Sequence, residues 1–247
     1  MADVSEEVKA NYLALTDKTV TTISDNIASF KGKKALLESY ARLATLNAIK
    51  LDLIEGDWSE PAKRFFEEAH NDAMLSHLNA SFGSWRPALQ SMRSFLENTM
   101  MAIYYSEHPV ELLKWERGDH RIEPRDLREY VASHPVIALV ASDTDLKKEL
   151  DSEYRDLSAA VHGSKSIFRM TNSDGKPNLA ETKPERLGKW AARERATVNL
   201  CVLMLASFFN QGLDGAKRQP MRDSMRISLS KKSKAALKKH FNVRIGD

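Results

Sequence analysis

Two side chains near the end of one predicted helix have types and a spacing that could do acid–base chemistry. In the stretch DSEYRDLSAAVHGSKS, residues 151–166, Arg155 precedes His162 by seven positions. An α-helix turns by about 100° per residue, so both side chains point the same way after about two turns. The guanidinium keeps its positive charge, whereas an imidazole takes up and releases protons near neutral pH. A fixed cation and a proton-transferring group therefore share one helix face.

The pair belongs to a polar row that runs beside an apolar row on the same helix. Both rows have spacings of 4, 3 and 4 residues, as a helix face requires. The apolar row, which we expect to face the core, is Leu150, Tyr154, Leu157 and Val161. The polar row is Asp151, Arg155, Ser158 and His162. Small side chains at Ala159 and Ala160 would let another backbone come close. Gly163 is a natural helix end, which puts His162 in the last turn, where free carbonyl groups favour a protonated imidazole.

The loose pattern of an arginine followed by a histidine occurs twice more, so the pattern alone is not informative. The other two pairs are Arg64 with His70 and Arg128 with His134. Their six-position separation places the side chains about 120° apart on a helix. Pro135 also disfavours helical geometry at His134. The spacing therefore favours the pair in the opening stretch.

An alternative interpretation of the polar row needs no catalysis. Arg155 could form an ion pair with Asp151 or Glu97, while His162 only caps the end of its helix. The row would then stabilise the fold and bind nothing.

The hydrophobic pattern of the whole chain is that of helices, because apolar residues recur at threes and fours and no strand pattern is evident. Predicted helices cover residues 6–27, 33–56, 60–78, 85–108, 110–117, about 125–132, 145–162, 184–212 and 231–241. Ser59, Ser84 and Ser230 are the expected N-caps of three of them, and Asp143 or Asp145 begins the helix with the polar row. We therefore predict an all-α, up-and-down helical bundle with additional N-terminal helices. Residues 1–216 would form this domain, with its motif-bearing core at about 84–213.

The C-terminal segment, residues 217–247, differs in charge from the rest of the chain. It holds ten Lys and Arg against two Asp, a net charge of +8, which leaves −5 for residues 1–216 out of a total of +3. We expect a basic tail with one short helix. Such a tail suits a polyanion such as nucleic acid, association with the acidic body, or simple solvation.

Several classes of protein are disfavoured by what the sequence lacks. Neither a glycine-rich phosphate loop nor a GxSxG or HExxH motif occurs, and a lone Cys201 cannot build a disulfide or thiolate zinc site within one chain. A carboxylate–histidine metal face at residues 67–77 would need a second ExxH unit that the chain lacks. We expect no cofactor and no metal. The polar N-terminus is unlike a secretory signal, and the apolar run 198–209 is too short to span a membrane, so we expect a cytoplasmic protein that does not enter membranes.

The segment EYRDLSAAVHGS, with MRSFLENTMMAIYYSEHPVEL upstream, resembles the HEPN superfamily of small helical-bundle domains, many of which are ribonucleases. That family's motif is an arginine, a polar residue, three to five further residues and a histidine, near the end of a late bundle helix. Here it reads Arg155, Asp156, five residues and His162, at the long end of this spacing. The resemblance covers residues 84–166 and does not extend to the first three helices or the basic tail.

The resemblance implies metal-independent cleavage of RNA, with the 2′-hydroxyl of the RNA as nucleophile. His162 would transfer a proton and Arg155 would stabilise the negative charge of the transition state. Asp156 would orient a neighbour or reach across an interface, and Ser158 would hydrogen-bond a phosphate. The supporting residues would be Arg93, Glu97 and Tyr154, and the residues that bind the RNA backbone would be Lys165, Lys231, Lys232 and Lys234.

The resemblance also implies a homodimer, because family members typically pair two motifs in a shared cleft. We therefore predict an RNA-cleaving homodimer that acts as a toxin or anti-phage defence effector and is held inactive by an antitoxin or other partner. Two alternatives remain open: an inactive helical module that binds RNA or protein, and an unrelated helical scaffold.

Overall fold

The computed structural model of the chain describes residues 2–164, 168, 170, 171, 175, 177–213 and 218–246. Its regular elements are helices, and the only strand-like pairing in these residues is an isolated bridge between Thr171 and Pro177. The predicted all-α helical bundle is confirmed.

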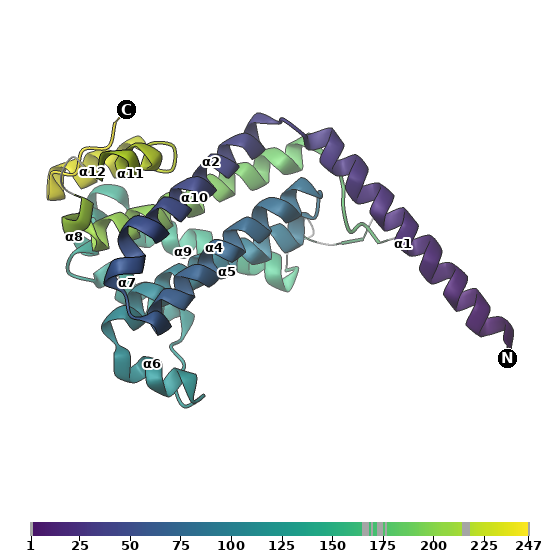
Figure 1. Cartoon of the computed structure of the whole chain (residues 1–247), viewed down its shortest axis with the longest axis horizontal. Helices are drawn as coiled ribbons and strands as arrows, with labels where there is room; N and C mark the ends of the chain where they lie inside the picture. The colour runs from purple at the N-terminus through teal and green to yellow at the C-terminus, as the bar shows by residue number, and fades with distance from the viewer. Residues whose placement is uncertain are drawn as a thin grey trace.

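The α-helices are numbered along the chain and labelled in Figure 1 where space allows. The first group comprises α1 (Ala2–Phe30), α2 (Lys34–Ile49), α3 (Glu55–Asp57), α4 (Glu60–Ser81), α5 (Trp85–Glu107) and α6 (Pro109–Glu116). The second comprises α7 (Pro124–Ser133), α8 (Ile137–Thr144), α9 (Leu146–His162), α10 (Pro184–Phe208), α11 (Gln219–Met225) and α12 (Lys231–Phe241). A π-helical segment, Lys50–Ile54, joins α2 to α3, and a short 3₁₀ helix, Asn210–Leu213, follows α10.

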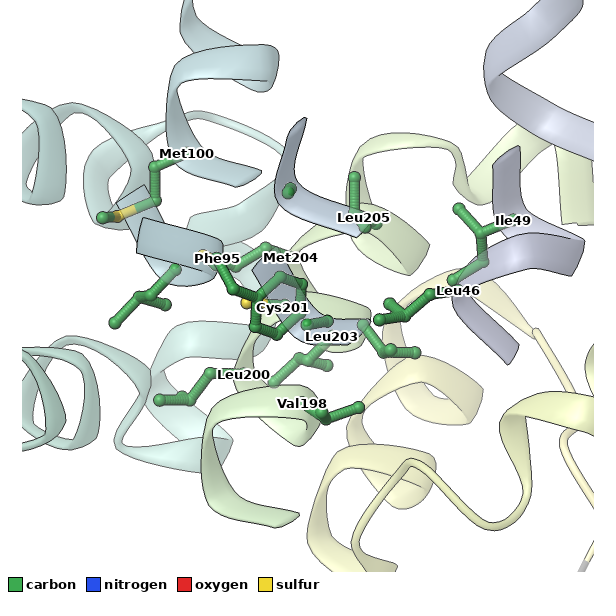
Figure 2. Close-up of a cluster of buried hydrophobic side chains, with 14 of the residues drawn as sticks. Leu46, Ile49, Phe95, Met100, Val198, Leu200, Cys201, Leu203, Met204 and Leu205 are labelled. Carbon is green, nitrogen blue, oxygen red and sulfur yellow. The ribbon is translucent and has the colours of Figure 1, made fainter. Parts of the chain in front are cut away.

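The core is built around α10, whose residues from Leu200 to Ser207 are buried. Figure 2 shows this helix contributing Val198, Leu203 and Leu205 to a cluster with side chains of α2 and α5. The lone cysteine, Cys201, is buried in this cluster, as expected. Its burial raises the pKa of the thiol to about 12. Within the described residues, no helix is both long and apolar enough to cross a membrane.

A buried ion pair joins α2 to α10 beside this cluster. The Arg42 side chain is 1% exposed, and its Nε donates to the Glu194 carboxylate oxygens at 2.8 and 3.0 Å, while Nη2 also contacts Oε2. Burial raises the pKa of Glu194, and the hydrogen bonds and charge of Arg42 oppose that rise. Neither charge has access to water, so each depends on the other.

The segment after residue 217 packs on the rest of the chain, which is one of the options that its charge left open. Helix α11 packs on α2, and α12 packs on α8 and α10. The buried residues of this segment, which join the main core, are Met221, Met225, Leu229, Ala236, Leu237, Val243 and Ile245. The charge count could not choose between these options, because the apolar residues between the basic ones have helical spacing and decide the packing.

Two further helices and two caps differ from the prediction. The short helices α8 and α11 were both missed, because each is brief and flanked by proline or charged residues. Ser230 caps α12 as expected, with its Oγ accepting from the Ser233 amide at 3.1 Å. Ser84 does not cap α5 with its hydroxyl, which instead donates to the carbonyl of Leu179 at 3.0 Å. Ser59 precedes α4 without a side-chain cap.

Helix α1 projects away from the bundle, with the N-terminus at its far end (Figure 1). It contacts the rest of the chain at its C-terminal end, where Asn26 Nδ2 donates to the carbonyl of Phe82 at 2.7 Å. The Phe30 ring packs edge-on against Trp85 with 5.8 Å between centroids. The remainder of α1 is exposed along most of its length.

Candidate functional site

Helix α9 carries the candidate site, and packing fixes its inner face. Leu150 and Leu157 of the apolar row are buried as predicted, whereas Tyr154 and Val161 are half-buried; Ala160 is also buried. The helix packs on α5, α7, α8 and α10. Because the inner face is fixed, the outward direction of the polar row is fixed too.

The C-terminal end of α9 is held by an arginine that the sequence analysis missed. Arg86, in the first turn of α5, donates from Nε to the carbonyl of Ala160 at 3.1 Å and from Nη2 to that of Val161 at 2.7 Å. Gly163 follows with φ +59°, and a Cβ there would lie 3.4 Å from the Arg86 guanidinium. This contact positions the last turn, in which His162 lies. No sequence signal identifies Arg86, since its partners lie 74 and 75 positions further along the chain.

Arg155 and His162 are both exposed and lie two turns apart on the outward side of α9. An Arg155 Nη2 atom lies 3.4 Å from the Ser152 Oγ, which is a weak contact. Within the described residues neither side chain forms an ion pair. The alternative pairing of Arg155 is not observed, because Asp151 binds Arg128 at 2.8 Å and Glu97 binds Arg93 at 2.9 Å.

Lys148 extends this exposed face by two more turns toward the N-terminal end of α9. It precedes Arg155 by seven positions and is exposed. A shallow depression beside it is lined by Lys147, Lys148, Asp151, Ser152 and Arg155. The seven-residue spacing was visible in the sequence, but an exposed lysine on a helix is too common to single out. We call Lys148, Arg155 and His162 the cationic face.

The supporting residues expected from the upstream helix do come together, behind the cationic face. Tyr154 donates its hydroxyl to Glu97 Oε1 at 2.8 Å, and Arg93 Nη2 donates to the same hydroxyl oxygen at 2.6 Å. Arg128 stacks over the Tyr154 ring, 4.1 Å from its centroid. Burial raises the pKa of Tyr154, so the phenol is neutral and serves as a hydrogen-bonding link. The cluster ties α5, α7 and α9 together.

Asp156 contacts a neighbouring helix, whereas the Ser158 hydroxyl is not placed to bind a phosphate. Asp156 faces α10, where Arg193 Nη2 lies 3.1 Å from its Oδ2, and Arg193 also binds Glu153 at 3.0 Å. The Ser158 hydroxyl oxygen is buried and has no hydrogen-bond partner in the described part of the chain. It lies too close to the apolar row to reach a phosphate outside. Of the predicted catalytic residues of one chain, only Arg155 and His162, on the cationic face, are therefore exposed and could contact an RNA.

The lysines assigned to RNA binding lie elsewhere or are engaged. Lys165 falls outside the described residues. Lys231 is exposed, Lys232 forms an ion pair with Asp145, and Lys234 donates to the carbonyl of Gly246 at 3.0 Å. Asp145 begins α9, so α12 adjoins the end of that helix remote from His162, about 25 Å along the axis.

The other two Arg–His pairs do not form comparable sites. Arg128 is committed to Asp151, and His134 Nε2 lies 3.0 Å from a Glu107 oxygen. His70 is half-buried, and burial lowers its pKa. Arg155 and His162 differ from these residues in being exposed, and they form no ion pair among the described residues.

A cavity of about 440 Å³ lies on the other side of α9, between α5, α10 and the side chains of Phe168, Met170, Asn178, Leu179 and Glu181. Its lining includes Trp85, Phe168, Trp190 and Glu153. Glu153 is about 200° from Arg155 around α9, so the cavity does not open onto the cationic face.

A carboxylate on α4 makes the stability of this region depend on pH. Burial raises the pKa of Asp72 to about 6, while a hydrogen bond from Asn98 opposes the rise and the charges of Glu68 and Glu97 add to it. Between the ordinary aspartate pKa of 3.8 and about pH 6, the folded chain holds at this carboxyl a proton that the unfolded chain has lost. The contribution of this group to stability therefore falls as pH rises through this window.

We expect Asp72→Asn to raise the melting temperature at pH 7, because the neutral amide removes the buried charge and can still accept from Asn98. At about pH 4 both proteins are neutral at this position, and their melting temperatures should nearly coincide. Calorimetry at the two pH values tests this. An equal gain at both would show that the effect is not electrostatic.

Comparisons of the chain with models of known protein families, with curated proteins and with solved structures found no match.

Proposed function

We propose that this protein is a metal-independent endoribonuclease whose reacting groups are Arg155 and His162. The observation that carries the proposal is the exposure of both side chains on one face of α9, with no ion pair to neutralise either in the described residues. The resemblance to the HEPN motif supports the same assignment.

In the proposed reaction the 2′-oxygen of the RNA attacks the adjacent phosphorus and the bond to the 5′-oxygen breaks. The products are a 2′,3′-cyclic phosphate and a 5′-hydroxyl. His162 moves a proton at the 2′-oxygen or at the leaving oxygen. Arg155 stabilises the added negative charge on the phosphate oxygens through its planar fork. The RNA supplies the nucleophile, so the protein needs none of its own.

A single arginine and histidine are few groups for this reaction, so we propose that a second copy contributes its own pair. Ala159 lies between Arg155 and His162 along the helix and would allow close approach of a partner helix. Ala160 is buried within the chain and is not available to such an interface. A cytoplasmic toxin or defence effector, restrained by a partner protein, remains our proposed biological context.

One observation favours a second candidate, a module that binds RNA without cleaving it. Asp156 binds Arg193 and Ser158 is buried, so the cationic face alone would contact a phosphate backbone. Three cations or potential cations in a row suffice for electrostatic binding.

Incubating the wild-type protein with an RNA and with a DNA of the same sequence, in excess chelator, separates the two candidates. We expect the RNA alone to be cut, with 2′,3′-cyclic phosphate and 5′-hydroxyl ends. Binding of RNA without cleavage would favour the second candidate, and cleavage of the DNA would exclude attack by a 2′-hydroxyl.

Lys148→Ala is expected to weaken RNA binding and to reduce the slope of log K against log salt by about 0.7 to 1, because one phosphate contact is lost. Lys147→Ala is the matched control. Lys147 is the neighbour of Lys148 in the sequence, but its side chain forms an ion pair with Glu129. Binding titrations at several salt concentrations measure both slopes. Equal slopes for the two variants would show that RNA does not lie along the cationic face.

A further inference from the structure

Helix α1 exposes large apolar side chains that no described part of the chain covers. The exposed fractions are 61% for Val8, 59% for Leu15 and 63% for Val20, and 42% for Ile27 close to the bundle. The helix is 29 residues long, about 44 Å, and only its last turns touch the bundle. Isolated helices gain little stability from helix propensity alone. The many Thr, Val and Ile residues of α1 lower its helix propensity further.

Six apolar residues of α1 are arranged so that two antiparallel copies match. They lie within an arc of about 140° around the helix, which Val4 and Leu13 widen to about 180°. In one antiparallel register, the numbers of two opposing residues always sum to 35. Val8 of one copy then lies opposite Ile27 of the other. In the same way Tyr12 lies opposite Ile23, and Leu15 opposite Val20. Antiparallel coiled helices pack such pairs in layers across their seam.

Charge selects the same orientation. Glu6 and Glu7 lie near the free end of α1, and Lys31 and Lys33 lie at the end attached to the bundle. Antiparallel pairing puts the acidic end of each copy beside the basic end of the other and opposes the helix dipoles. Parallel pairing would place like charges together and bring the two bundles against each other (Figure 1).

We propose that α1 is a self-association helix, which pairs in antiparallel orientation with α1 of a second copy of this chain and holds the two bundles at opposite ends. This interface is distinct from the one on α9 and does not depend on RNA cleavage.

Cysteine cross-linking of the full chain tests the orientation. With a short bifunctional maleimide, Val8→Cys/Ile27→Cys should give a cross-linked dimer. Val8→Cys alone and Ile27→Cys alone should not, because identical positions are about 28 Å apart in the antiparallel pair. The buried Cys201 provides no competing site in the folded chain. A cross-link in both single variants would indicate parallel pairing, and its absence in the double variant would show that α1 does not pair; either result overturns the proposal.

Sedimentation measurements test the interface itself. Leu15→Asp should raise the dimer dissociation constant at least about tenfold, because a charge enters the seam. Ala14→Asp, one position earlier on the opposite face, should leave it unchanged. Because the proposed α9 interface could still hold two copies together, the deciding readout is the distribution of sedimenting species. A distribution that Leu15→Asp leaves unchanged, or a monomeric wild type, would overturn the proposal. Since neither variant touches α9, the cleavage assay remains a separate test of the proposed function.

Discussion

Replacing His162 with alanine is expected to lower the rate of RNA cleavage by about 10²- to 10⁴-fold, the usual contribution of a general acid or base. The imidazole is exposed at the last turn of α9 and is not part of the core, so its removal leaves the fold intact. Binding of RNA should change little, because the charges of Arg155 and Lys148 remain. Cleavage of a labelled RNA under single-turnover conditions measures the rate, and a binding titration measures the affinity.

The matched control is Arg64→Ala, in another exposed arginine that precedes a histidine on a helix. It should cleave RNA at the wild-type rate, and both variants should keep the helical circular dichroism and melting temperature of the wild type. A His162→Ala protein that still cleaves at the wild-type rate would exclude His162 as a catalytic residue, whatever the source of the activity.

Replacing Arg42 with alanine is expected to destabilise the fold by about 3–5 kcal/mol, since it leaves the buried carboxylate of Glu194 without its partner. The Arg42 side chain bridges α2 and α10 and is almost inaccessible to water. The carboxylate could then remain folded only by taking up a proton, so the loss should be larger at pH 8 than at pH 5. Denaturant unfolding at both pH values measures the change.

An exposed ion pair between the same two helices provides the control. Arg195 binds Glu38 at 2.7 Å, but the arginine side chain is 60% exposed. Arg195→Ala should cost no more than about 1 kcal/mol. If the two variants lost comparable free energy of unfolding, burial would not be what makes the ion pair of Arg42 and Glu194 strong.

Much of the fold was predictable because its signals are local. The rows of α9 follow from helical period alone, and so does the burial of Leu150 and Leu157. The N-cap at Ser230 followed from a short polar side chain directly before an amphipathic run. These features depend on residues within one or two helical turns.

The features that were missed depend on contacts between distant segments. Arg86 reaches the end of α9 from 74 positions away, and Ser84 turns from its own helix to Leu179. Ser158 lies on the predicted polar row, yet its hydroxyl oxygen is buried in the folded chain. Spacing gives the direction of a side chain around its helix but not the depth of the groove in which it lies.

A similar reason accounts for the C-terminal segment. Its net charge predicted a tail, whereas the lysines lie on the outer face of α12 and Leu237 on the inner face. Lys239 and Lys232 bind Asp143 and Asp145, which accounts for part of the acidic charge of the body. Association of this segment with the body, one of the options that the charge left open, is therefore what the fold shows.

The central claim is that Arg155 and His162 act together on one RNA phosphate, and a double-mutant cycle tests it most directly. Single-turnover cleavage of one RNA in excess chelator would be measured for wild type, Arg155→Ala, His162→Ala and the double variant. We expect each single variant to lose most of the activity and the double variant to be little worse than either, as for groups that work as a unit. Wild-type rates in both single variants would contradict the account.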